Sequence, residues 1–212
     1  MPRTPAQMMD EVPVTTNPYV SSPAPASAPI TVPAAQQLRS VARQQGIPVP
    51  EVADRLPVRQ VGRVVPAWWL GAHGGAGETS LAALAPDVPA AGHAWPLRSD
   101  GGASSVLLVA RSHPRGLLAA QRAAQQYASG QVPGSVQLLG LVVIADAPGR
   151  LPQPVRTLYK RVAGAFPATW LVPWSEAWRA GEEPRPGDAA SRQLHKILSA
   201  LQLTNVSKGP QQ

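Results

Sequence analysis

The sequence predicts an α/β fold in which helices cover a small, mostly parallel sheet in three layers. Short apolar runs without alternation recur along the chain, the longest over residues 138–145, and such runs are typical of strands buried on both faces. Segments with helical spacing separate these runs, an order typical of three-layer α/β proteins. The 25 prolines and 18 glycines among 212 residues indicate that the packed part is smaller than the chain.

The first third of the chain contains few elements. Residues 1–33 hold eight prolines among Ser, Thr and Ala, and such a composition buries too little apolar surface to offset the ordering entropy. We therefore expect a disordered arm there. Residues 34–65 are expected to be a linker with a short helix over 34–45, one turn over 52–56 and a short strand over 58–65.

The globular domain is expected over residues 66–203, beginning with a buried strand at 67–70. A glycine-rich loop at 72–77 follows, and the apolar spacing predicts a short helix over 79–85 that ends before Pro86. A second short strand is expected over 93–97.

Strands and helices alternate in the rest of the domain. The longer helices show apolar residues at three- and four-residue spacing, and Pro114 suits the first turn of one of them. The expected strands cover 105–110, 138–145 and 168–172. The expected helices cover 115–129, 154–163 and 190–201. Residues 204–212 are predicted to be a polar tail.

Composition excludes several classes of site. The chain has no cysteine, which excludes disulfides, thiolate metal sites and cysteine nucleophiles and is compatible with a cytoplasmic location. No apolar run is long enough for an ordinary membrane span. The four histidines, His73, His93, His113 and His195, lack metal-ligand spacing, so we expect no metal site. The net charge of +7 permits an anionic partner such as nucleic acid, or simply an Arg-rich surface.

The loop around residues 71–80 has the features of an anion-binding loop. It reads Gly-Ala-His-Gly-Gly-Ala-Gly-Glu-Thr-Ser and lies between a predicted strand and a predicted helix, which is where phosphate loops occur. Glycines let successive backbone N–H groups converge on an anion. The candidate anion-binding residues are His73, Gly74, Gly75, Ala76, Gly77, Thr79 and Ser80.

This loop resembles the deviant Walker A motif of the MinD/ParA family of P-loop ATPases, Lys-Gly-Gly-x-Gly-Lys-Thr-Thr/Ser. The runs at 106–110 and 139–143 are similar to later core strands of that family. The loop is also similar to that of small uncharacterised actinobacterial proteins that keep His-Gly-Gly-Ala-Gly-Glu. The resemblance covers roughly residues 66–180 in pieces and implies a P-loop fold, with ATP and Mg²⁺ as the family's cofactors.

Three departures from the family motif argue against hydrolysis. Glu78 replaces the P-loop lysine, His73 replaces the signature lysine, and Ala72 replaces the first glycine. No strand ends in an aspartate that resembles the family's metal anchor. A carboxylate near a phosphate is repulsive by about 4 kcal/mol at 4 Å and an effective dielectric near 20. We therefore expect no catalytic residue and no bound cofactor, with Glu78 as a loop carboxylate.

Other charged residues give weaker hypotheses. Asp146 and Arg150 follow the central strand at its carboxyl end, where α/β sheets place their sites, so they are candidates for the same crevice as the loop. Arg111, Arg115 and Arg122 are candidates for nucleic-acid contacts.

The combined expectation is a non-catalytic MinD/ParA-like protein that acts as a cytoplasmic interaction or regulatory factor. A link to plasmid, phage or chromosome maintenance would fit that family, and the partner would be a protein. Two alternatives stay open: an active ATPase with an unusual phosphate loop, and a basic nucleic-acid-associated protein.

Overall fold

The computed structural model describes residues 40–182, 185 and 187–203. The chain divides into two units, residues 1–34 and 35–212, and every described residue belongs to the second. The predicted arm at 1–33, the tail at 204–212 and the first residues of the predicted helix at 34–45 lie outside the described residues.

A five-stranded parallel sheet forms the centre of the unit, as the apolar runs predicted. Its strand order is β3-β2-β5-β6-β7, and every neighbouring pair is parallel. The central strands β5 and β6 are almost entirely buried because helices cover both of their faces. The strands are β2 (Trp68–Gly71), β3 (Ala90–Gly92), β5 (Ser104–Arg111), β6 (Val136–Ile144) and β7 (Thr169–Val172).

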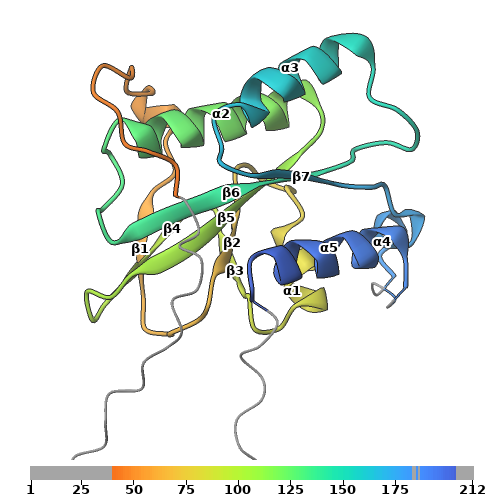
Figure 1. The fold of residues 1–212 in the computed structure, drawn as a ribbon, viewed down its shortest axis with the longest axis horizontal. Coiled ribbons are helices and arrows are strands. Elements are labelled where there is room, and N and C mark those ends of the chain that lie inside the picture. Colours follow the sequence, from red (N-terminus) through yellow and green to blue (C-terminus); the bar gives the residue numbers. More distant parts are fainter. Residues whose placement is uncertain (1–39, 183–184, 186, 204–212) are drawn as a thin grey trace, which may run out of the picture. The chain divides into compact units, whose positions relative to one another are not determined.

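Helices cover the two faces of this sheet and complete the three layers (Figure 1). On one face α2 (Pro114–Ala128) and α3 (Gln153–Ala163) pack against alternate residues of β5 and β6. On the other face α1 (Glu78–Leu84) and α5 (Ala189–Ala200) pack against the residues in between. The mixed α/β, mostly parallel architecture is thus confirmed.

The chain changes direction across the sheet between β2 and β5. From β2 it moves outward to β3, and later it returns to β5 on the opposite side of β2 and continues to β6 and β7. Connections that leave in opposite directions open a crevice at the carboxyl ends of the two strands, where ligands bind in open α/β sheets. The glycine-rich loop follows β2 and therefore lies at this position.

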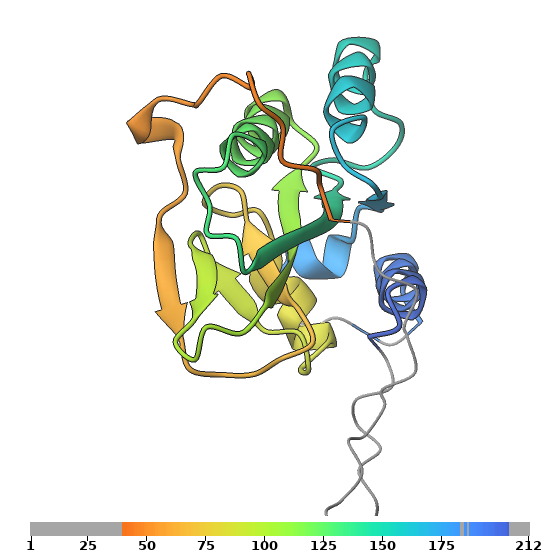
Figure 2. The same cartoon turned by 60° about the vertical axis from the view of Figure 1, so that its left-hand side comes forward.

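A smaller sheet lies beside the main one. The strand β1 (Val58–Val61) pairs in parallel with β4 (Trp95–Arg98), and Figure 2 shows the two side by side. The sequence placed a strand near each of these segments but gave no partner for either. The sequence did not predict the short β3, because Ala-Ala-Gly has no strand signal. The four-residue helix α4 (Glu176–Arg179) was not predicted either.

The helix expected over 34–45 is wrong in its described part. Residues 40–44 have no regular secondary structure, and 45–46 form a turn. Their backbone N–H groups bond elsewhere: Val41 donates to the carbonyl of Leu138, and Gln44 donates to the carbonyl of Ala128. Tertiary hydrogen bonds therefore replace the local helical ones.

The turn expected over 52–56 is confirmed as a short 3-10 helix, η1 (Val52–Asp54). The strand expected over 58–65 is shorter than predicted and ends at Val61. No helix within the described ranges is long and apolar enough to cross a membrane.

Candidate functional site

The glycine-rich loop joins β2 to α1 and is held to the neighbouring strand β5. Its first residue after β2, Ala72, donates its N–H to the carbonyl of Val109 at 2.8 Å. Gly75 and Gly77 have φ values of +74° and +100°, a conformation that side-chain-bearing residues rarely adopt. These two glycines are thus required by the path of the loop.

The ring of His73 is bonded at both nitrogens. Its Nε2 accepts the backbone N–H of Arg111 at 3.2 Å, and its Nδ1 lies 2.9 Å from the carbonyl oxygen of Gly74. Since Nε2 accepts, the proton of the neutral ring belongs on Nδ1, which donates to Gly74. The hydrogen bonds give this histidine a loop-stabilising role, whereas the sequence made it a candidate for anion binding.

The environment of His73 favours the neutral form. Burial lowers the pKa of His73 below its ordinary value of 6.5, and the nearby His113 adds to the shift, whereas the carbonyl of Gly74 opposes it. The rings of His73 and His113 lie 5.2 Å apart between centroids. His113 in turn caps α2 by accepting the N–H of Gly116 at Nδ1.

The carboxylate of Glu78 lies inside the protein. The residue is only 6 % exposed, and its Oε1 lies 3.6 Å from Nε2 of His93. The ring of His93 also contacts the carbonyl oxygen of Gly71 at 3.2 Å through Nδ1. A Cβ on Gly71 would lie within 2.8 Å of both side chains, so the glycine at the end of β2 makes room for this pair.

Arg111, at the end of β5, extends its guanidinium across the loop. Its Nε donates to the carbonyl of Gly75 at 3.3 Å, and its NH1 donates to the carbonyl of Ala145, just after β6, at 3.2 Å. This side chain therefore connects the glycine loop to the ends of β5 and β6 and places a positive charge beside the loop. The sequence had assigned it to nucleic-acid contacts instead.

The remaining predicted loop residues differ in exposure. Ala76 and Gly77 are buried, whereas Gly74, Gly75 and Thr79 are exposed and Ser80 is half-buried. An anion from solvent could therefore contact Gly74, Gly75 and Thr79 directly, but not the buried Ala76 and Gly77.

Asp146 and Arg150, the second candidate pair, form no hydrogen bond or ion pair with the glycine loop within the described part of the chain, although Asp146 follows Ala145, whose carbonyl accepts from Arg111. The N–H of Asp146 donates to Oγ of Ser112 at 2.9 Å, and its side chain is exposed. Arg150 lines a groove formed by α3, β7 and the segments next to them, and no residue of the glycine loop lines that groove.

The three candidate nucleic-acid contacts also have different surroundings. Arg111 is held on the loop, Arg115 is exposed at the start of α2, and Arg122 pairs with Asp54 at 3.0 Å. Hence one of the three charges is already matched by a carboxylate.

Two contributors to this site were missed from the sequence. Neither His93 nor the loop role of Arg111 has a local signal, because each contacts the loop from another element. Among the described residues no group of three His, Asp or Glu side chains could hold a metal ion.

Comparison with known proteins gives a family but no function. No curated protein and no solved structure matches the chain. A family model described as "Family of unknown function (DUF6668)" matches residues 65–194, which include the sheet, the glycine loop, Glu78 and Arg111. The chain therefore belongs to the DUF6668 family.

Proposed function

We propose that this protein is a degenerate relative of the MinD/ParA-type P-loop ATPases that does not hydrolyse nucleotide and acts as an interaction or regulatory factor. Two features support the proposal at the level of fold. The sheet is parallel with helices on both faces, and the loop that resembles a deviant Walker A motif follows the strand at which the chain reverses direction.

The observation that carries the non-catalytic part is the position of Glu78. In the family that the loop resembles, this position holds the lysine that meets the phosphates. Here it holds a buried carboxylate paired with His93 at 3.6 Å and packed at the end of β2. The side chain is thus part of the internal structure, and its charge has the wrong sign for a phosphate.

The loop offers little to magnesium-bound nucleotide. Mg²⁺ is usually held by one or two carboxylates together with the phosphates, and the carboxylate of this loop, Glu78, is buried and paired with His93 instead. His73 replaces the second lysine, and both of its ring nitrogens are already bonded to backbone groups, one of Gly74 in the loop and one of Arg111 at the end of β5.

One observation favours a second function, nucleotide binding without turnover. The guanidinium of Arg111 lies against the loop, within 3.9 Å of the position that a Cβ on Gly77 would occupy, and arginine is well suited to bind phosphate. A guanidinium supplied by β5 would replace part of the charge that the loop lost at Glu78.

Nucleotide titration of the full chain separates these functions. We expect the wild type to bind Mg-ATP weakly, with no measurable affinity below millimolar concentrations, and to release no phosphate above background. Glu78→Gln removes the negative charge and keeps the shape of the side chain. Glu78→Lys introduces the lysine that the MinD/ParA motif has at this position. Both should bind nucleotide more tightly than the wild type, and more so at low salt. Glu51→Gln, which changes an exposed carboxylate on another segment, is the matched control.

Two results decide against the proposal. Phosphate release by the wild type that is lost in Glu78→Gln would make Glu78 catalytic. Tight nucleotide binding by the wild type that is lost in Arg111→Gln would establish the second function. Thermal unfolding of each variant checks that the loop substitutions leave the fold intact.

A further inference from the structure

The face of the sheet that carries α2 and α3 is incomplete at the edge strand. Leu171 on β7 is 38 % exposed, whereas the next residue, Val172, is fully buried on the opposite face under α5. Successive strand residues point to opposite faces, so Leu171 points to the face of α3. A strand of a three-layer fold is normally covered on both faces, and here α3 leaves Leu171 uncovered.

The uncovered region is a groove of about 650 Å³ between α3, the segment before it and the end of β7. Leu171 and Trp174 line it from the β7 side, and Tyr159 lines it from α3. The hydroxyl of Tyr159 is protonated at neutral pH, as in any tyrosine, and can donate a hydrogen bond. Cavities of 300 to 1,000 Å³ with mostly apolar walls are typical of small-molecule sites.

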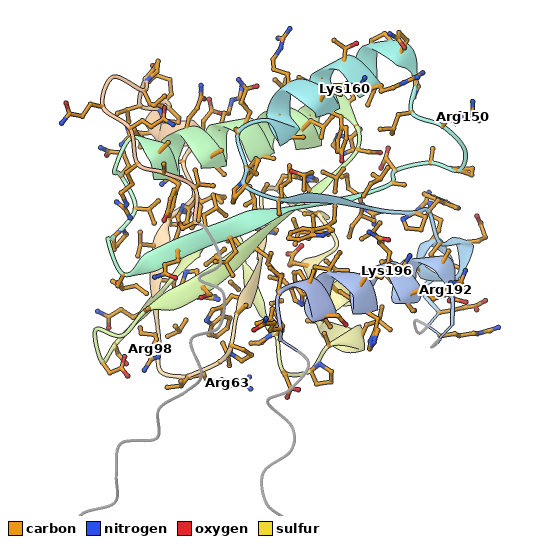
Figure 3. All side chains as sticks on the ribbon, viewed as in Figure 1. Arg63, Arg98, Arg150, Lys160, Arg192 and Lys196 are labelled. Atoms are coloured by element: carbon orange, nitrogen blue, oxygen red, sulfur yellow. The ribbon has the colours of Figure 1, made fainter. Side chains whose placement is uncertain are left out.

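The charged residues that line this groove are all basic, although the carboxylate of Glu176 accepts from Nε1 of the lining residue Trp174 at 2.9 Å. Arg150, Arg156 and Lys160 line it, no acidic residue does, and all three cations are exposed. Within the part of the chain that the structure describes, none of the three forms an ion pair. Figure 3 shows Lys160 on α3 and Arg150 on the segment that precedes it. Three unpaired cations beside an apolar wall are electrostatically complementary to an anion with an apolar body.

We infer that the groove between α3 and β7 binds a small organic anion, in which a carboxylate, sulfonate or phosphate group is attached to an aromatic or aliphatic body. The acidic group would lie among Arg150, Arg156 and Lys160, and the body would cover Leu171 and Trp174. This site shares no residue with the glycine loop, so its test does not depend on the function proposed for the loop.

Two dyes that differ in charge test the inference. The anionic probe is 8-anilinonaphthalene-1-sulfonate, and the neutral probe is N-phenyl-1-naphthylamine, which has the same aromatic body without the sulfonate. Each is titrated by fluorescence into the full chain, into the double variant Arg156→Gln/Lys160→Gln and into Leu171→Ser. The matched control is Arg63→Gln/Arg115→Gln, which removes two exposed cations that do not line this groove.

We expect the double variant on α3 to weaken binding of the sulfonate dye about tenfold at low salt and to leave the neutral dye unchanged. Leu171→Ser should weaken both dyes, and the control pair should affect neither. Equal effects of the α3 pair and the control pair, or an equal loss for the two dyes in the α3 variant, would overturn the inference. So would an unchanged affinity in all variants. All substituted side chains are exposed, and circular dichroism confirms that the variants remain folded.

Discussion

The backbone N–H of Arg111 donates to Nε2 of His73 over 3.2 Å, which joins the end of β5 to the glycine loop that follows β2. The same arginine returns to the loop through its side chain, which donates to the carbonyl of Gly75. Backbone and side chain of one residue thus fix two points of the loop. The imidazole acts as an internal acceptor here and leaves no ring nitrogen for a ligand.

This bond makes the stability of the protein depend on pH through His73. Because burial lowers the pKa of His73 below 6.5, the unfolded chain binds a proton there more tightly than the folded one. The stabilisation of the fold by the neutral ring of His73 is fully present above pH 6.5 and is lost as the pH falls below 6.5. We expect the free energy of unfolding to decrease as the pH falls below 6.5, and the decrease to be smaller in His73→Gln, which cannot titrate.

Urea unfolding at several pH values measures this difference. His195→Gln, which removes an exposed histidine on α5, should keep the wild-type dependence. An identical pH dependence in His73→Gln and the wild type would contradict the assignment of the effect to His73.

Gly116 in α2 should not tolerate a side chain. A Cβ there would lie 2.5 Å from the carbonyl oxygen of Arg111 and 2.8 Å from Nε2 of His73. Alanine is normally favoured over glycine within helices by about 1 kcal/mol, but here the clash reverses the sign. We expect Gly116→Ala to lower the free energy of unfolding by about 1–3 kcal/mol.

Gly134→Ala is the control for that substitution, because a Cβ on Gly134 would meet no atom within 4 Å and the φ of this residue is not positive. Denaturant unfolding should show little change in this variant. A stabilised Gly116→Ala protein would show that α2 can move away from the loop.

The side chain of Gln126 on α2 forms hydrogen bonds to two residues that are far from it in the sequence. It is 3 % exposed, and its Oε1 accepts from the N–H of Leu56 at 2.9 Å and from Nε1 of Trp95 at 3.1 Å, while its Nε2 donates to the carbonyl of Leu56 at 2.8 Å. Gln126→Leu leaves buried donors without an acceptor. The expected loss of stability is about 2–4 kcal/mol.

Thermal and urea unfolding measure this loss, with Gln121→Leu as the comparison. Gln121 lies on the same helix, and its side chain makes no hydrogen bond to any described residue. A loss below that of the comparison variant would mean that water replaces the bonds of Gln126.

The arginines of α2 should contribute little to DNA binding. Arg122 is already paired with Asp54, so Arg115 is the candidate on this helix that is exposed and forms no ion pair with a described residue. We expect Arg115→Ala/Arg122→Ala to change the salt dependence of duplex affinity only slightly, measured by fluorescence anisotropy from about 50 mM salt upward. A slope that falls by about two in this variant would instead support the nucleic-acid function.

The sequence was sufficient for the parts of the fold that depend on local pattern. The apolar runs of β5 and β6 and the spacing in α2 predicted those elements within two residues of their observed ends, since burial on both faces leaves a clear signal. For residues 40–44 the local pattern gave a wrong prediction. Its composition favours a helix, but hydrogen bonds to Leu138 and Ala128 hold it in another conformation.

The candidate site was predictable only in part, for a related reason. The position of the glycine loop between a strand and a helix follows from local sequence, and the structure has it there. The partners of its side chains come from elsewhere in the chain: Glu78 meets His93 fifteen residues on, and His73 meets the backbone of Arg111. Contacts at such separation depend on strand order, which no local pattern encodes.

The pairing of β1 with β4 shows that the packed structure extends beyond the family match, which begins at residue 65 and ends at residue 194. A fragment cut at those residues would lose β1, the Leu56 backbone that satisfies Gln126, and Ile197 of α5, which is fully buried. It would expose edge hydrogen-bonding groups on β4 and apolar surface on the sheet, both of which promote aggregation. Work on this family therefore requires the flanking segments, even though the sequence similarity that defines the family does not include them.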